Sequence, residues 1–272
     1  MLAHQSARIL VAGAVVLFWV LLGHDLHLDP NSYLLVGIPL LVVFQLFVAR
    51  RPITELWLKH QPAFRLSKLG WVAAVVAMIY PAYSLIEGWR VAGLPERIWF
   101  IAATLGAIPL GFAVGHAPRK TWLVLLVCFA IAGTLGCAEM AVGSMAMHHR
   151  WGLPHDAMTT VRIIARNFLL YLPVCFMIEE VFFRGGLDSF MQREGDRHGW
   201  LTAVLLSAFW GWWHLAIFPK TTWMELGVLV IVLPLMHLIP GVTFSYSWRM
   251  SGSLLAPAVV HSFIDSFRNA VM

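Results

Sequence analysis

Long apolar runs alternate with short polar stretches along almost the whole chain. Each run holds roughly 20 residues, which is the length an α-helix needs to cross the hydrocarbon core of a bilayer. With soft ends, the runs fall at about 9–23, 33–49, 69–88, 97–116, 121–143, 163–192, 200–218, 223–247 and 252–271. The pattern predicts an all-α fold, a polytopic transmembrane helical bundle with eight to nine spans.

Composition narrows the class of protein further. The chain is 60% hydrophobic and only 12% charged, which excludes an ordinary soluble domain. Its formal net charge is +5, but the basic residues are scattered through short connections. We therefore expect the lipid bilayer as a partner and no nucleic acid.

Basic residues crowd two of the connections, and the positive-inside rule places such loops in the cytoplasm. They are Arg50, Arg51, Lys59, Arg65 and Lys68 in one loop and Arg119 and Lys120 in the other. This assignment puts the N-terminus in the cytoplasm, and the compact chain with short loops is typical of a bacterial inner membrane protein. The segment 51–68 either lies flat in the headgroup layer or forms a plain loop.

Polar residues within the spans are concentrated in the last hundred residues. The first spans hold few of them, apart from Gln45 and Glu87 near likely span ends. This asymmetry predicts two parts. Residues 1–150 form N-terminal transmembrane helices that act as a scaffold or select the substrate, and residues 151–272 hold the functional site.

The stretch IEEVFFRG, residues 178–185, places three charges at the end of an apolar run. A charge near the bilayer centre costs about 2.5–3.5 kcal/mol on insertion scales, so its presence indicates a function. Glu180 and Arg184 are four residues apart on one helix face and are expected to form a supporting ion pair. Glu179 points about a third of a turn away, so it is free to face a cavity.

Three more polar side chains are expected at a similar depth. Counted at 1.5 Å per residue from polar turns on the same side, Glu179 lies roughly 20 Å deep and His214 roughly 21 Å. His261 and Asp265, four residues apart in the last span, lie about 14 and 20 Å deep. These groups should meet around a water-filled cavity that opens towards the side of those turns. The Pro-Gly pair at 240–241 should interrupt the preceding span beside it.

This set of side chains suits two kinds of chemistry. A carboxylate can act as the general base that activates water, with histidines donating to the developing oxyanion. The same residue types are zinc ligands, in which case Glu179, His214 and His261 would bind the metal. No HExxH sequence is present, which favours a site without a cofactor. The residues alone leave both alternatives open.

Three motifs, in this order, are similar to those of the CPBP intramembrane proteases, a family that includes the CAAX prenyl endopeptidases and was formerly called Abi. The motifs are EExxxR at 179–184, an aromatic-xxx-His ending at His214, and GSL at 252–254 followed by Pro257 and HxxxD at 261–265. The resemblance covers roughly residues 165–270. It implies that residues 151–272 form a CPBP-like catalytic core.

The resemblance also implies a role for each motif residue. Glu179 would be the catalytic base that activates water. His214 and His261 would stabilise the oxyanion, and Glu180 with Arg184 would hold the arrangement together. The usual view of the family is a metal-independent glutamate mechanism, so no cofactor is expected and zinc is the alternative.

Two positions depart from the family pattern. Trp210 stands where Phe is usual, four residues before His214, and we expect this change to affect packing rather than chemistry. Asp265 stands where Asn is usual, and an ionised carboxylate cannot donate to an oxyanion. Asp265 is therefore either protonated and donates as Asn would, the role we favour, or it accepts from His261 and fixes that ring.

We expect an intramembrane endopeptidase whose substrate is a membrane-bound protein or peptide. The alternative is a non-catalytic immunity or binding protein of the same family, which would have no need of Glu179, His214 and His261. A proton-coupled transporter is a third hypothesis, but the repeat symmetry and paired broken helices expected of one are missing.

Overall fold

The computed structural model describes residues 2–61, 63–148, 154–192, 199–218 and 222–272. These residues are mostly helical, and their one strand-type pairing is an isolated bridge between Leu58 and Ser253. The longer helices are α1 (Leu2–Asp25), α2 (Pro30–Val43), α3 (Lys68–Gly88), α4 (Leu94–His116), α5 (Lys120–Cys128), α6 (Thr134–His148), α7 (Ala157–Cys175), α9 (Trp200–Trp213), α10 (Trp223–Ser251) and α11 (Leu255–Val271). The prediction of an all-α bundle is confirmed.

Short helical segments extend or join these helices. Three are π-helices, η1 (Phe44–Val48), η3 (Phe129–Gly133) and η4 (Val181–Asp188), and η4 leads into the short α8 (Ser189–Met191). Two are 3₁₀ helices, η2 (Ile53–Leu56) and η5 (His214–Ala216).

The predicted spans fall into two groups in the structure. Six helical segments are long and apolar enough to cross a membrane: Gln5–Asp25, Pro30–Val48, Lys68–Gly88, Leu94–His116, Lys120–Ala146 and Trp223–Ser251. The other three predicted spans contain α7 with its continuation, α9 and α11, which are broken, short or more polar. These three carry the predicted motifs, so the candidate site lies where the spans are least regular.

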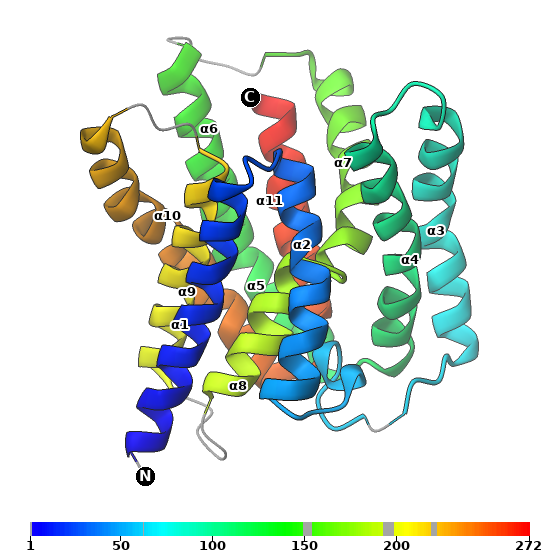
Figure 1. Cartoon of the computed structure of the whole chain (residues 1–272). Coiled ribbons are helices and arrows are strands. Elements are labelled where there is room, and N and C mark those ends of the chain that lie inside the picture. The colour runs from blue at the N-terminus through cyan, green and yellow to red at the C-terminus, as the bar shows by residue number, and fades with distance from the viewer. Residues whose placement is uncertain (1, 62, 149–153, 193–198, 219–221) are drawn as a thin grey trace.

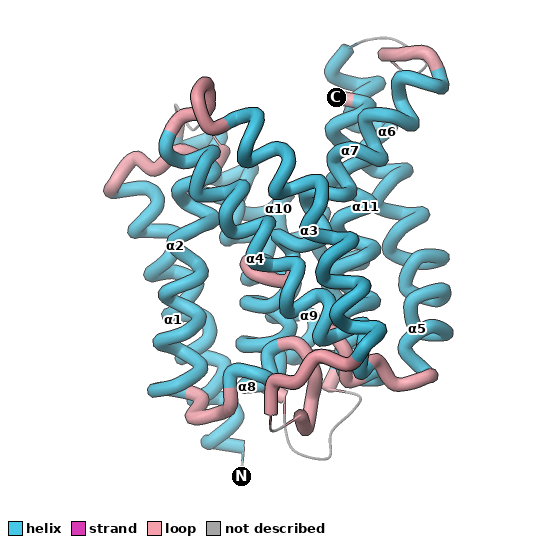
Figure 2. Tube along the Cα trace, turned by 90° about the vertical axis from the view of Figure 1, so that its right-hand side faces the viewer, coloured by secondary structure: helices cyan, strands magenta, loops and turns pink. Residues whose placement is uncertain are grey.

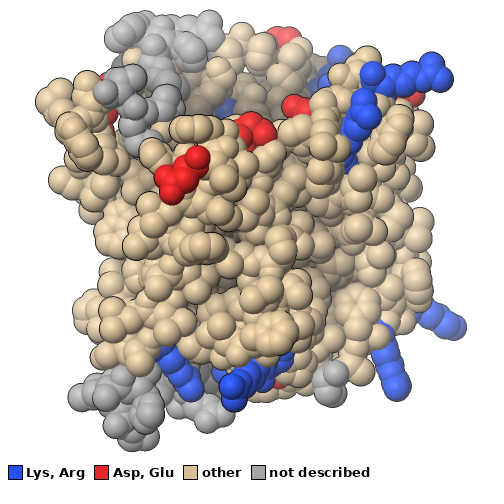
Figure 3. Space-filling model, viewed as in Figure 1, with Lys and Arg blue, Asp and Glu red and all other residues tan. Residues whose placement is uncertain are grey.

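The helices run between two ends of the molecule (Figures 1 and 2). The N-terminus, α8 and the connection between α2 and α3 lie at one end, called here the N-terminal end. Figure 3 shows basic side chains at this end, a band without charges across the middle, and a hollowed surface with charged side chains at the opposite end. Exposed apolar residues such as Leu69, Val72 and Val76 on α3 fit a surface that faces lipid. The fold is that of an integral membrane protein.

The predicted span at 163–192 is broken, which corrects the expectation of one continuous helix. α7 ends at Cys175, two residues after Pro173, and residues 176–178 form turns. Proline has no N–H and its ring clashes with the preceding helical turn, so helices tend to end near it. Helical backbone begins again at Glu179 and continues into η4. Glu179 therefore lies at the start of a new helical piece.

The Pro-Gly pair at 240–241 does not interrupt the preceding span, because α10 runs unbroken from Trp223 to Ser251. The expectation of irregular backbone there was wrong. Gly241 instead permits close packing of α10 on α9: an added Cβ would lie 2.5 Å from Oγ of Ser207. Small residues commonly serve this purpose between helices in membranes.

The connection between α2 and α3 packs into the bundle, instead of lying flat in the headgroup layer or forming a plain loop. Leu56 and Leu58 are almost fully buried. The backbone N–H of Lys59 donates to Gly252 O at 2.9 Å, and that of Leu254 donates to Trp57 O at 3.0 Å. Residues 56–59, called here the strap, are thus fixed to the turn between α10 and α11.

Candidate active site

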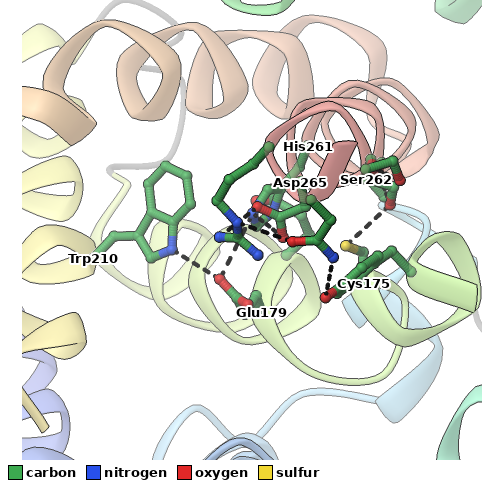
Figure 4. A network of polar contacts seen from close by, with 12 residues as sticks. Cys175, Glu179, Trp210, His261, Ser262 and Asp265 are labelled. Carbon is green, nitrogen blue, oxygen red and sulfur yellow. Dashed lines mark hydrogen bonds and ion pairs between the residues drawn. The ribbon is translucent and has the colours of Figure 1, made fainter. Parts of the chain in front are cut away.

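Polar side chains from three separate segments meet inside the bundle (Figure 4). Glu179 and Glu180 come from the start of the second piece of the broken span. Trp210 comes from α9, and His261 and Asp265 come from α11. The predicted convergence of Glu179, His261 and Asp265 is therefore present in the structure.

Glu180 is the buried centre of the arrangement. Its Oε1 accepts from Arg184 Nη1 at 3.1 Å and lies 2.9 Å from His261 Nδ1. The side chains of Glu180 and Arg184 are fully buried, and the ion pair expected from their spacing is confirmed. The guanidinium of Arg184 lies 4.4 Å from the ring centroid of Trp210 and 5.3 Å from that of Phe244. Such aromatic faces stabilise a desolvated cation.

The contact with Glu180 determines which ring nitrogen of His261 carries a proton and which one faces the rest of the site. A carboxylate beside Nδ1 assigns a proton to that nitrogen, which leaves Nε2 to face the rest of the site. His261 Nε2 lies 3.8 Å from Glu179 Oε2 and 3.5 Å from Asp265 Oδ2. These two distances are longer than hydrogen bonds, so Nε2 has no close hydrogen-bond partner among these two carboxylates.

Glu179 differs from its neighbour in having few tight partners. Its side chain is 16% exposed, whereas that of Glu180 is 0% exposed. Trp210 Nε1 donates to Glu179 Oε2 at 3.2 Å. The expectation that Trp210 changes only packing was wrong, because an indole carries an N–H donor that the usual phenylalanine lacks. That difference could have been read from the sequence.

Asp265 is held between two cations or potential cations. Its Oδ2 faces His261, and its Oδ1 lies 3.1 Å from Nη1 of Arg268, whose side chain is 38% exposed. Sequence analysis did not assign Arg268 to the site, although its spacing of three residues from Asp265 places both on one helix face. A guanidinium can only donate, so Oδ1 of Asp265 is placed to accept from it.

His214 lies beside the carboxylate cluster and makes no contact with Glu179 among those described. Its Nδ1 is 2.9 Å from Trp210 O, and its ring centroid is 4.3 Å from that of His237. The Nδ1 atom of His237 is likewise 2.8 Å from Leu233 O. Both rings therefore point their Nε2 atoms away from these backbone carbonyls. His237 is not among the site residues predicted from the sequence.

A metal ion would be held by a different set from the one expected. Ligand atoms of Glu179, His261 and Asp265 lie within 4.8 Å of one another. One imidazole and two carboxylates are a reasonable donor set for a divalent cation, and the contact of His261 with Glu180 is the outer hydrogen bond usual for a ligating histidine. His214, which the sequence analysis included in the metal set, does not belong to this group.

Towards the N-terminal end, residues 181–189 are buried, and Leu56 of the strap packs against Gly185 and Gly186. The expected opening of the site towards the polar turns at this end stays a prediction. The partly exposed groups Asp265 and Arg268 lie on α11 between His261 and the C-terminus, and the surface is hollowed at that opposite end (Figure 3).

The fold and the site define a helical membrane protein with carboxylates and a histidine gathered inside the bundle. Residues 162–267 match a family model, Rce1-like, whose description is type II CAAX prenyl endopeptidase Rce1-like. The match confirms the resemblance to the CPBP proteases and includes the residues of the carboxylate cluster. No curated protein and no solved structure matches the chain.

Proposed function

We propose that this protein is an intramembrane endopeptidase that hydrolyses a peptide bond in a membrane-bound protein or peptide. The observation that carries the proposal is the environment of Glu179, a partly exposed carboxylate beside Trp210 Nε1 and His261 Nε2. A general base needs such an atom within reach of water, and a purely structural glutamate does not.

Glu179 acts as the general base. It accepts a proton from a water molecule as the water oxygen bonds to the scissile carbonyl carbon. The same carboxyl then returns that proton to the amide nitrogen as the C–N bond breaks. The products are a new carboxylate and a new amine, so one water is consumed for each bond cut. Trp210 orients Glu179 through its indole N–H.

His261 stabilises the oxyanion through Nε2. Glu180 accepts from Nδ1, and Nε2 faces the carboxylates of Glu179 and Asp265 at 3.8 and 3.5 Å. When the ring carries a second proton, that proton sits at Nε2. That N–H can turn to a developing negative oxygen. His214 can serve as a second donor only when it also carries two protons, because Nδ1 is already directed at Trp210 O. The ring of His237 lies beside it, with the two centroids 4.3 Å apart.

Asp265 acts on His261 and not as an oxyanion donor. Its Oδ1 faces a guanidinium that can only donate, and its Oδ2 faces Nε2 of His261, so both oxygens are placed to accept. This placement weighs against the protonated role favoured from the sequence. The carboxylate keeps the imidazole of His261 turned towards Glu179.

Zinc remains the alternative to a metal-free site. Glu179, His261 and Asp265 would hold it, and the ion would lower the pKa of a bound water and polarise the scissile carbonyl. The proposal favours the glutamate mechanism because the chain lacks an HExxH sequence.

The proposed setting is a bacterial inner membrane with the N-terminal end in the cytoplasm. Figure 3 shows basic side chains at that end and at the opposite one, so the orientation rests on the two basic connections, 50–68 and 119–120. The candidate site then lies in the membrane, with the strap packed on the cytoplasmic side of η4.

Isotope labelling tests the hydrolytic reaction across many candidate peptides at once. Purified protein in liposomes is incubated with a panel of lipid-modified and transmembrane peptides in water enriched in ¹⁸O, and products are examined by mass spectrometry. We expect new C-termini that carry ¹⁸O with the wild-type protein and none with Glu179→Gln. The exposed Glu87→Gln serves as the matched control and should cleave normally.

The immunity or binding alternative gives the opposite result. A binding protein would retain a peptide without producing labelled termini, and Glu179→Gln would bind it as well as the wild type does. Equal product from Glu179→Gln and wild type would also contradict the proposal.

A further inference from the structure

Helix ends next to two proposed catalytic residues expose backbone carbonyls. The last carbonyls of a helix have no partner within it, and leaving one unpaired inside a protein is costly. α9 ends at Trp213, directly before His214. α7 ends at Cys175, and Phe176 follows it, three residues before Glu179. α9 continues directly into the 3₁₀ helix η5, and a side chain from the N-terminal half donates to a backbone carbonyl at each of the two helix ends.

The N-terminal half supplies the donor at α9. Tyr33 of α2 is fully buried, and its hydroxyl donates to Trp213 O at 2.8 Å. The Tyr33 ring also stacks on the Trp213 ring, with centroids 5.1 Å apart. Trp19 of α1 donates from Nε1 to Tyr33 O at 2.9 Å, which fixes the tyrosine in turn. The position of His214 is thus tied to α1 and α2.

The N-terminal half also supplies the donor at the broken span. Trp57 of the strap donates from Nε1 to Phe176 O at 2.5 Å. Strap and span are in close contact beyond this bond, since an added Cβ on Gly185 would clash with Leu56 O. Only glycine at 185 allows the strap this near to η4.

The strap binds the start of α11 as well. Leu58 pairs with Ser253, and the hydrogen bonds of Lys59 and Leu254 flank that bridge. Gly252 in this turn has φ of 71°, a left-handed conformation that suits glycine. α11 carries His261 two turns further on. One short segment therefore contacts both the piece that carries Glu179 and the helix that carries His261.

We infer that Tyr33 and Trp57 are positioning residues, which set the places of His214 and Glu179 through the backbone carbonyls of Trp213 and Phe176. Both lie outside the segment 162–267 that matches the protease family. The inference gives the N-terminal half a defined part in the reaction and rests on the proposed peptidase function. Misplacement of reacting groups by about 1 Å can cost up to about 10²-fold in rate.

Substitutions that remove the two donors test the inference. Tyr33→Phe removes the hydroxyl alone, and Trp57→Phe removes the indole N–H together with part of the ring. Each is expected to lower kcat by about tenfold to 10²-fold with KM within about twofold, because the substrate is not touched. Tyr83→Phe and Trp71→Phe on exposed faces of α3 are the matched controls and should keep wild-type kcat.

A spectroscopic measurement separates this inference from the proposed function. ¹⁵N spectra of histidine-labelled full-length protein, assigned with His214→Gln and His261→Gln, report the two rings without any substrate. Tyr33→Phe should shift the His214 signals and Trp57→Phe those of His261, with the controls unchanged. If the wild type cleaves no peptide, the proposed function fails. The changes in the histidine signals still show whether Tyr33 and Trp57 position these rings.

Two results would overturn the inference. One is wild-type kcat with unchanged histidine spectra in both donor variants. The other is a fall in kcat that occurs to the same extent in the control variants and that matches their loss of thermal stability. If Trp57→Phe does not accumulate in membranes, benzothienylalanine at position 57, which keeps the ring shape and lacks the N–H, is measured in its place.

Discussion

Two layers of charge at the broken span and the helices beside it differ in how well their members are paired. The lower layer holds Glu180, Arg184, Asp188 and Arg249, whose side chains are fully buried and whose ion-pair contacts measure 2.6–3.1 Å. The upper layer holds Glu179 and Asp265, which are partly exposed and lie 3.8 and 3.5 Å from the buried His261. The first layer balances its charges at hydrogen-bond distance. The second has longer contacts and partly exposed carboxylates, which makes it the candidate reaction centre.

The adjacent glutamates give the sharpest test of this difference. Glu179→Gln should lower the rate of peptide cleavage by about 10²–10⁴-fold, since it removes the general base, while membrane accumulation and thermal stability stay normal. Glu180→Gln should reduce folded protein as well as activity, because Arg184 loses its buried partner. Both are measured by cleavage assay and by fluorescence-detected chromatography. Normal cleavage by Glu179→Gln would remove the distinction between the layers.

The lower layer can be broken without touching the upper one. Asp188 accepts from Arg249 Nε at 2.9 Å and from Nη2 at 2.6 Å. Arg249→Met should destabilise the protein by about 3–5 kcal/mol, because an unpaired carboxylate remains buried. Thermal unfolding in detergent measures this, with the exposed Arg119→Met as control. A melting temperature equal to that of the control would show that this pair contributes little to the fold.

Asp265 and Arg268 test the pairing within the upper layer. Asp265→Asn should keep activity within about tenfold, because its amide oxygen still accepts from His261, whereas Asp265→Ala should lose more. Arg268→Met should lower activity in the wild type and have no further effect beside Asp265→Asn, since the ion pair is already absent. A double-mutant cycle of cleavage rates measures this coupling. Additive effects would mean that Arg268 does not act through Asp265.

Lys59 lies near Asp188 and Arg249 of the lower layer and allows a test with a smaller expected effect. Burial lowers its pKa from 10.5 to about 8, although Asp188 partly opposes the shift. Between about pH 8 and pH 10.5 the Lys59 amine is protonated in the unfolded chain and neutral in the folded protein. The free energy of unfolding should therefore rise as the pH increases from about 8 to 10.5. Lys59→Met should flatten this slope in melting temperature. An unchanged slope would show that another group is responsible.

Chelation should have the smallest effect of all. The glutamate mechanism predicts that prolonged treatment of the purified protein with a strong chelator leaves cleavage unchanged. Metal analysis of the treated sample verifies removal. Activity that is lost and then restored by zinc would assign Glu179, His261 and Asp265 as ligands and replace the mechanism proposed here.

The parts of this structure that depend on local spacing could be read from the sequence. Apolar length located the spans, and four-residue spacing found the pairs Glu180–Arg184 and His261–Asp265. The break after Cys175 was missed because apolar residues continue through it, although Pro173 was a signal.

Long-range contacts could not be derived in the same way. Trp57 and Phe176 are 119 residues apart, and Tyr33 and Trp213 are 180 apart. No periodic pattern connects such positions, because their contact depends on how complete helices pack. Trp210 was misjudged for a different reason: its aromatic ring was considered and its N–H was not.

The π-helix η4 makes chain length itself a property of the site. Its eight residues follow Glu180 directly, and a π-helix bonds residue i to i+5 where an α-helix bonds i to i+4. The π-helix therefore turns the chain by less per residue than the roughly 100° of an α-helix, so η4 holds its residues without changing the directions of the flanking side chains. If the same number of residues wound as an α-helix, Asp188 would face away from Arg249, or Glu179 away from His261. The number of residues in η4 and its wider winding thus match each other, and together they set the angular phase between Glu179 and Asp188.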